Sequence, residues 1–222
     1  MSRDLISCTF VNLKPGTAKT TSSVYTAAAL YRRGLSVLLV DADPAGSAQA
    51  WADAVPGGLP WLTVGLARQS IRRELPALVR QTGADAVVVD SPQLEDHARI
   101  TRAAMAVTQT WIVPVAPSPI EVHRTAQVIG HMDEVAADLD TEPDRWVLLN
   151  RTNSSRIGRR GPAADARDAL APLGLLVLDH PVEHHDTRYR QSWGTLPDPA
   201  GTAYDQLAMR LGAPPTLVAE AL

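Results

Sequence analysis

The chain has 222 residues and a mass of 23.8 kDa, with 45% hydrophobic and 20% charged residues. This length and composition exclude the disordered and low-complexity classes and predict one compact domain over residues 1–222. The 21 basic and 24 acidic side chains give a formal net charge of −3, so binding to nucleic acid would require a local basic patch.

Neither a targeting segment nor a disulfide framework is expected. The first residues lack the basic region, long apolar run and small-residue cleavage site of a secretion signal. Charges or prolines interrupt every apolar stretch before it reaches the roughly 20 residues that cross a bilayer. Cys8 is the only cysteine, which excludes an intrachain disulfide and a cysteine-built metal cluster. These features are typical of a cytoplasmic protein.

Short apolar runs alternate with helical stretches along the chain. The unbroken runs, rich in Val and Leu, predict strands that are buried on both faces, at 5–11, 35–40, 86–89, 110–115, 146–149 and 175–178. The predicted helices lie at 20–33, 46–54, 68–82, 97–107, 119–139 and 161–172, with two or three more from 184 to the end. This order predicts the α/β class, with a mostly parallel twisted sheet and helices on both faces. Ligands of such sheets bind at the carboxyl ends of the strands.

A candidate phosphate-binding loop joins the first predicted strand to the first predicted helix. Residues 12–21 read NLKPGTAKTT and hold the only two lysines of the chain, Lys14 and Lys19, although arginine is the usual base elsewhere. Backbone N–H groups of a loop that opens a helix face a bound anion. Lys19 would reach the β- and γ-phosphates, and Thr20 would ligate Mg²⁺. The strict pattern G-x-x-x-x-G-K-[ST] fails at two positions, Leu13 and Ala18.

Three carboxylates follow strands that we expect to end beside this loop. Asp41 and Asp43 come after the second run, and Asp90 follows the run at 86–89. Carboxylate oxygens at this edge of the sheet are where a nucleotide-bound Mg²⁺ needs ligands, directly or through water. One such aspartate is more often a turn former, but three of them beside a loop with Lys-Thr favour a single P-loop NTPase domain.

These segments together resemble a known family. KPGTAKTT, VLLVDADPAGS, VVVDSP and the strand-end sequence PVAPSP are similar to the deviant Walker A, Walker A′, Walker B and following loop of ParA/MinD-type ATPases. The compact chain is similar to the small ParF-like plasmid-partition proteins. The likeness extends from the first strand to about Asn150, and beyond it only in length and layout.

The resemblance implies ATP and Mg²⁺ as cofactors and a role for each matching residue. Lys14 would cross to the nucleotide of a second copy, so that ATP is sandwiched in a homodimer, and its charge would act on the phosphoryl group as an arginine finger does. Lys19 and Asp43 would be catalytic, with Asp43 placing the attacking water. Thr20, Asp41 and Asp90 would hold the metal. The nucleotide contacts would come from Gly16, Thr17, Ala18, Lys19, Thr20 and Thr21, and those to adenine from Asn150, Arg151 and Pro181.

Two positions depart from the family motif, which reads K-G-G-x-G-K-[ST]. Pro15 has no N–H and a fixed φ, and its ring adds bulk where two subunits would meet. Ala18 cannot take a positive φ without a cost of about 1 kcal/mol or more. Gly16 and the N–H groups that follow it remain available for nucleotide binding. We therefore expect slow intrinsic hydrolysis.

Arginines near the end of the chain form a candidate DNA-binding patch. Arg156, Arg159 and Arg160 follow Arg151 with no acid among them, and Arg188 and Arg190 come after the last predicted strand. Phosphate contacts by such a patch would give sequence-independent, salt-sensitive binding, as the nonspecific nucleoid association of partition ATPases implies. A solvated surface in an arginine-rich protein is the alternative.

Other signals favour structural roles. The residues His180, Glu183, His184, His185 and Asp186 could ligate a metal, but neighbouring histidines point to different faces, so a loop or helix cap is the preferred interpretation. The five tryptophans are scattered and are expected to pack in the core. The tail 211–222 has no cation and one acid, unlike the basic amphipathic membrane helix of MinD-like proteins, so no membrane partner is expected.

The sequence thus predicts a partition ATPase that segregates plasmid or chromosome DNA. It would bind DNA nonspecifically and be stimulated by a small centromere-binding adaptor of the ParB type. One alternative is a poorly hydrolysing, nucleotide-gated module in conjugation or replication, and another is a ParA-like positioner of a different cargo, such as carboxysomes or chemoreceptors. Metabolic ligases of the dethiobiotin-synthetase kind share the fold but usually lack the lysine two residues before Gly16.

Overall fold

The computed structural model describes residues 5–152 and 161–215. The strands are β1 (Ile6–Phe10), β2 (Val37–Asp41), β3 (Leu62–Gly65), β4 (Ala86–Asp90), β5 (Thr110–Val115), β6 (Asp144–Leu149) and β7 (Leu176–Val177). The helices are α1 (Lys19–Arg32), α2 (Ser47–Ala54), α3 (Ile71–Thr82), α4 (Leu94–Met105), α5 (Pro119–Ala136), α6 (Pro162–Leu170) and α7 (Ala203–Arg210), with short turns η2 (Ala171–Leu173) and η3 (Asp186–Arg190).

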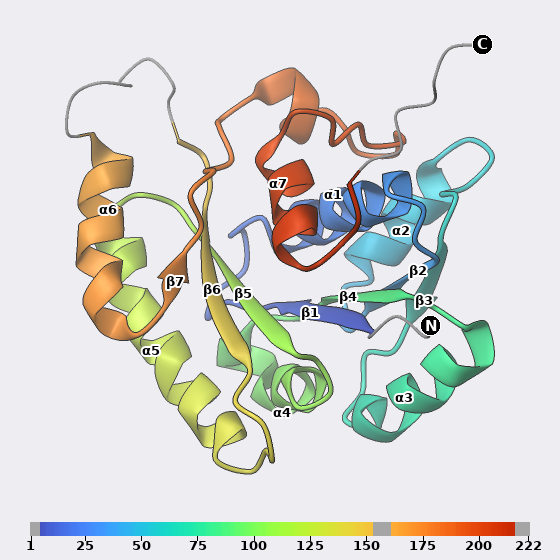
Figure 1. The fold of residues 1–222 in the computed structure, drawn as a ribbon, viewed down its shortest axis with the longest axis horizontal. Helices are drawn as coiled ribbons and strands as arrows, with labels where there is room; N and C mark the ends of the chain where they lie inside the picture. The colour runs from blue at the N-terminus through green and yellow to red at the C-terminus, as the bar shows by residue number, and fades with distance from the viewer. Residues whose placement is uncertain (1–4, 153–160, 216–222) are drawn as a thin grey trace.

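The seven strands form one parallel sheet between two layers of helices (Figure 1). Their order is β3-β2-β4-β1-β5-β6-β7, so the chain reaches one edge at β3, returns to place β4 between β1 and β2, and then continues through β5 and β6 to the other edge at β7. This architecture confirms the predicted α/β class. Because all strands run the same way, the loops after β1, β2, β4 and β6 meet at one edge of the sheet.

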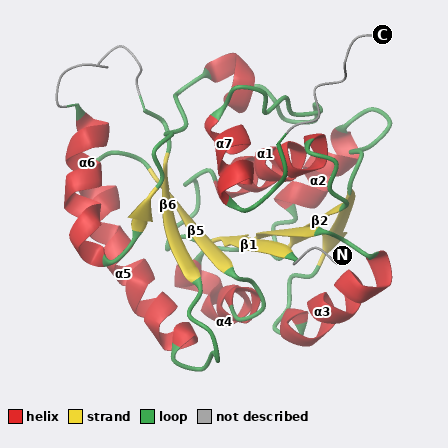
Figure 2. Cartoon of the chain, viewed as in Figure 1, coloured by secondary structure: helices red, strands yellow, loops and turns green. Residues whose placement is uncertain are grey.

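The helices cover both faces of the sheet (Figure 2). Helices α1, α2 and α7 pack on one face, and α3, α4, α5 and α6 pack on the other. Strand β2 shows how the sequence specifies this. Val37 and Leu39 enter the core that β2 shares with α1, α2 and α7, while Leu38 and Val40 enter the core on the opposite face, with α3 and α4. All four are at most 4% exposed, which is the burial on both faces that its unbroken apolar run predicts.

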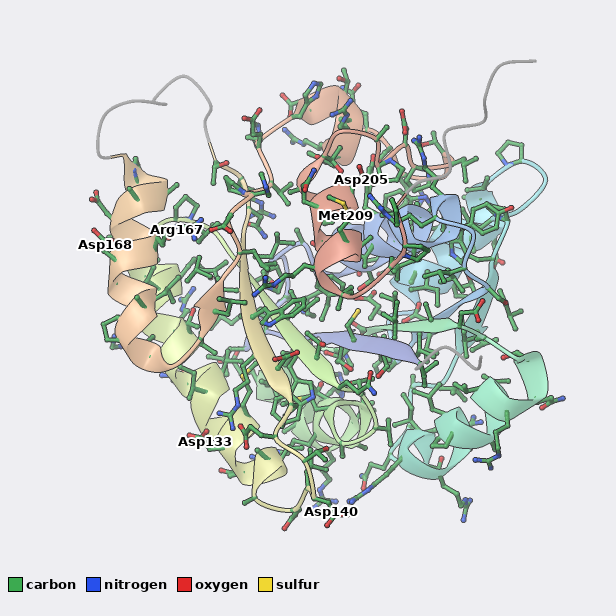
Figure 3. The ribbon with its side chains drawn as sticks, in the orientation of Figure 1. Asp133, Asp140, Arg167, Asp168, Asp205 and Met209 are labelled. Atoms are coloured by element: carbon green, nitrogen blue, oxygen red, sulfur yellow. The ribbon has the colours of Figure 1, made fainter. Side chains whose placement is uncertain are left out.

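Side chains of α6 and α1 fasten the C-terminal part of the fold. Arg167 donates to the carbonyl oxygens of Val177 and Leu178, at 2.9 and 2.7 Å, and so secures the edge strand β7 to α6 (Figure 3). Arg33, at the end of α1, makes a 2.8 Å ion pair with Asp205 of α7. These contacts hold the segment after β7 against the body of the domain.

The fold differs from the sequence prediction in three places. Strand β3 was missed because it is a short edge strand whose four residues are all at least partly exposed, so it lacks a buried apolar run. Helix α4 begins at Leu94, three residues before the predicted start, and His97 interrupts it with φ −130° and ψ 35°. The stretch after 184 holds the π-helical turn η3 and the single regular helix α7 within the described residues.

Four of the five tryptophans are buried, as expected, but Trp193 is 51% exposed. It lies 5.5 Å from Trp51, measured between ring centroids.

No helix in the described part of the chain has the length and apolar character needed to span a bilayer.

Candidate functional site

The loop between β1 and α1 has two residues in the left-handed region. Gly16 has φ +73° and Ala18 has φ +68°. Ala18 therefore carries the strain that the sequence predicts for a non-glycine residue at this place. Helix α1 starts at Lys19, and no described side chain caps its N-terminus. Its first N–H groups are thus available to an anion at the loop.

Lys19 lies inside this loop. Its side chain is buried, and its Nζ donates to the carbonyl oxygen of Lys14 at 3.3 Å. Burial lowers the pKa of Lys19, whereas the carboxylates of Asp90 and Asp43 act in the opposite direction. A buried ammonium with one backbone partner is suited to contact a phosphate that supplies the missing negative charge.

Asp41 and Asp43 shape the turn between β2 and α2. Asp41 is buried, and its two oxygens accept hydrogen bonds from the N–H groups of Asp43 (3.1 Å) and Gln49 (2.9 Å). It therefore fixes the start of α2 as well as the turn. Asp43 accepts from the N–H of Ala45 at 2.9 Å and lines the cavity beside the loop.

Asp90 ends β4 directly beside Asp41, its partner in the sheet register. One oxygen accepts from the Ser23 hydroxyl at 3.3 Å, and the other is buried without a hydrogen-bond partner among the described residues. Burial raises the pKa of Asp90 to about 7, and the Asp41 carboxylate adds to the rise, against the Thr20 hydroxyl and Lys19. An unpartnered buried carboxylate oxygen fits a hydrated divalent cation, which would supply the missing partner.

Asn150 and Arg151 contact the loop from the end of β6. The Asn150 amide donates to the carbonyl oxygen of Thr17 at 2.9 Å, and the Arg151 guanidinium donates to that of Gly16 at 2.7 Å. These are the side chains for which the resemblance implies adenine contacts. In this structure their polar groups are directed to the loop backbone.

A cavity of about 900 Å³ lies over the loop. Its lining includes these residues with a predicted catalytic or nucleotide-binding role: Gly16, Ala18, Lys19, Thr20, Thr21, Asp43, Asn150 and Arg151. Arg190, which was predicted to bind DNA, lines it as well. Pro181 instead lines an adjoining cavity of about 850 Å³ that shares Arg151. The sequence did not identify the further lining residues Gln93, His97, Trp51, Tyr189, Trp193 and Tyr204, since they come from several segments and no local motif marks them.

Lys14 lies at the outer side of the loop. Its Nζ is 3.6 Å from Glu95 in the first turn of α4, and its side chain is 37% exposed. The same turn docks on the loop, because the N–H groups of Leu94 and Glu95 donate to the carbonyl oxygens of Asn12 and Leu13. Lys14 is therefore held by its own chain in this single copy.

The predicted DNA-binding arginines divide into two groups. Arg156, Arg159 and Arg160 lie outside the described residues. Arg188 and Arg190 are exposed on η3, and Arg190 is 3.7 Å from Asp186.

The histidine cluster contains a local cap. His185 Nδ1 accepts a hydrogen bond from the N–H of Arg188 at 3.2 Å at the start of η3. His184 lies 3.6 Å from Asp186. These contacts agree with the cap interpretation of the cluster. Of the tail 211–222, residues 216–222 also lie outside the described part.

Known proteins share the sequence pattern and the fold of this chain. The model of the CobQ/CobB/MinD/ParA nucleotide binding domain family matches residues 8–182. The maintenance of carboxysome distribution protein A of Gloeobacter kilaueensis is 33% identical over 169 residues, which cover 76% of this chain and 72% of that protein.

Two solved structures share the fold. The MinC:MinD cell division complex of Aquifex aeolicus superimposes with a TM-score of 0.74 at 18% identity, over 94% of this chain and 96% of that one. An ATP complex of McdA from Cyanothece has a TM-score of 0.67 at 16% identity, over 95% of both chains.

Proposed function

Because the chain belongs to the CobQ/CobB/MinD/ParA nucleotide-binding family, and is an ATPase of the ParA/MinD type that uses ATP and Mg²⁺, we propose that it positions a cellular cargo. ATP binding would pair two copies of the chain, and hydrolysis would separate them. The observation that carries the nucleotide-dependent part of this proposal is the meeting, at one edge of the sheet, of Lys19, the left-handed loop and the Asp90 oxygen that has no hydrogen-bond partner among the described residues.

The chain's own residues divide the work at the nucleotide. Lys19 and the N–H groups of 16–21 would bind the phosphates, and Thr20 with Asp90 would hold Mg²⁺. Bound magnesium neutralises phosphate charge. Asp41, whose carboxylate already accepts a hydrogen bond from the Gln49 N–H of α2, would support the metal site without contacting the phosphates. Asp43, which lines the cavity, would orient the attacking water.

Lys14 provides the link to a second copy. It is partly exposed and lies at the rim of the loop, so a second chain can approach it. In the dimer it would leave Glu95 and contact the partner's triphosphate, where a second cation stabilises the charge that develops during phosphoryl transfer.

The proposed cargo is a large protein assembly and not plasmid or chromosome DNA. The relative with 33% identity is named for carboxysome distribution, which favours the positioning of a non-DNA cargo over plasmid partition of the ParF kind. A small adaptor that binds this cargo would then stimulate hydrolysis, in the place that a ParB-type protein has in partition.

Measurement of phosphate release tests this function. It also distinguishes a hydrolysing ATPase from the alternative given above, a poorly hydrolysing, nucleotide-gated module. We expect slow release from ATP and Mg²⁺ alone, several-fold stimulation when random duplex DNA and the protein encoded beside this one are added, and none from Lys19→Ala, which removes the buried cation. Tight nucleotide binding without stimulated turnover would support the non-hydrolysing module. Absence of nucleotide binding would contradict both.

Nonspecific DNA binding by the arginine patch is a separate part of the proposal. Replacement of Arg156, Arg159 and Arg160 by Ala should weaken retention on random duplex DNA and reduce the salt slope by about 3, since each phosphate contact contributes about 0.9.

The matched control for this experiment removes the same number of charges elsewhere, through Arg72→Ala, Arg73→Ala and Arg80→Ala. These three side chains are exposed on α3 and form no ion pair within the described residues. Equal losses of DNA retention in both variants would show that overall charge, and not the patch, governs binding.

A further inference from the structure

Two side chains at the end of β6 fasten a loop that lies more than 130 residues away in the sequence. The Arg151 guanidinium donates to the Gly16 carbonyl oxygen at 2.7 Å, and the Asn150 amide donates to the Thr17 carbonyl oxygen at 2.9 Å. Asn150 is 3% exposed, so its amide is shielded from water, whereas Arg151 is exposed. Both bonds join side chains to backbone carbonyls of consecutive residues.

These bonds control where the loop's N–H groups point. In a trans peptide unit the C=O and the following N–H lie on opposite sides of the chain. Fixing the Gly16 carbonyl therefore fixes the N–H of Thr17, and fixing the Thr17 carbonyl fixes the N–H of Ala18. The carbonyls are held on the β6 side, so the two N–H groups face away from it.

The loop needs such support because alanine occupies position 18, where the motif that it resembles has glycine. Ala18 has φ +68°, a conformation that its Cβ disfavours. Arg151 itself has φ +52°, so the residue that holds the loop is also strained. Strained residues persist only where the surrounding structure determines their conformation, and here each strained residue takes part in the same contact region.

We propose that Arg151 is a positioning residue: it acts on the phosphates through the Gly16 carbonyl, and so compensates for alanine at position 18. It does not read the base. This inference rests on the proposed function, because it assumes that the loop binds a triphosphate. It predicts that Arg151 and Ala18 are energetically coupled, and that the coupling does not depend on the base.

The test is a double-mutant cycle with two probes, Mg²⁺–ATP and Mg²⁺–triphosphate without a nucleoside, measured by calorimetry or competition. Arg151→Ala should weaken both probes by about tenfold, the loss expected for one charge-assisted hydrogen bond. In the Ala18→Gly background, where the loop adopts a positive φ without strain, the same change should weaken them by only about threefold.

Two further variants secure the interpretation. Arg72→Ala removes an exposed arginine of α3 that is outside the site, and it should bind both probes as the unaltered chain does. Arg151→Gly removes the clamp, which is the hydrogen bond from the Arg151 guanidinium to the Gly16 carbonyl oxygen. Because glycine accepts φ +52° without strain, this variant should reproduce the tenfold loss even if Arg151→Ala folds poorly.

The outcomes are distinguishable. A loss for ATP that is absent for triphosphate would overturn the inference, since Arg151 would then contact the nucleoside. Equal losses with and without the Ala18→Gly change would also overturn it, because the clamp would not act through the loop. Failure of the unaltered chain to bind either probe would contradict the proposed function itself.

Discussion

Asp90 is the residue whose environment departs most clearly from that of a surface carboxylate. Its pKa rises to about 7 from 3.8, first because of burial, while one of its oxygens lacks a partner among the described residues. The folded chain therefore holds this proton more tightly than the unfolded chain does. Its contribution to the free energy of unfolding is full below about pH 4 and is lost as pH rises through about 7.

We predict that the nucleotide-free and magnesium-free chain loses this contribution between pH 4 and 7, at up to about 1.4 kcal/mol per pH unit. Other carboxylates have their own pH dependence, so the measurement is the difference between the unaltered chain and Asp90→Asn in urea unfolding at several pH values. The difference should change with pH in this window. Parallel curves would show that Asp90 does not titrate there.

The first turn of α4 is the element that holds Lys14 in a single copy. It is set off from the rest of the helix by the non-helical His97, docks on the loop through two backbone hydrogen bonds, and places Glu95 beside Lys14. A partly exposed ion pair of this kind contributes about 0.2–1 kcal/mol. Loss of the Lys14–Glu95 ion pair on dimerisation therefore makes the free energy of dimerisation only slightly less favourable.

Glu95→Gln should release Lys14 and tighten the ATP-dependent dimer by about two- to fivefold, the equivalent of that ion pair. Sedimentation at a series of concentrations measures the dissociation constant. Glu74→Gln, which breaks the partly exposed ion pair between Glu74 of α3 and Arg68, is the matched control and should leave the constant unchanged. A weaker dimer in Glu95→Gln would mean that Glu95 supports the interface.

The strands show why only part of the fold could be predicted from the sequence. Strands β2 and β4 were predicted because both their faces are buried and their runs are continuous, and β3 was missed because it is a partly exposed edge strand. The placement of Asp41 beside Asp90 follows from parallel strands that end together. The clamp of Arg151 on Gly16 could not be predicted, since no local pattern reports a contact between residues so distant in the chain.

At the scale of the whole molecule, the fold gathers one site from four distant segments. The β1–α1 loop supplies Lys19 and the backbone N–H groups that we propose bind phosphate, β2 and β4 supply carboxylates, and β6 supplies the side chains that hold the loop. The exposed Trp193 and the aromatic side chains near it border the same cavity. Lys14 extends from the loop to the outside, so the site is open to completion by a second copy.

In the function proposed here, ATP and Mg²⁺ join two chains through Lys14. The most direct measurement is sedimentation velocity with a nonhydrolysable ATP analogue and Mg²⁺, on the unaltered chain and on Lys14→Ala, with nucleotide binding measured in parallel. We predict a dimer of the unaltered chain, and a Lys14→Ala variant that binds the analogue but remains a monomer. A Lys14→Ala dimer as tight as that of the unaltered chain, or an unaltered chain that binds the analogue and stays monomeric, would contradict it.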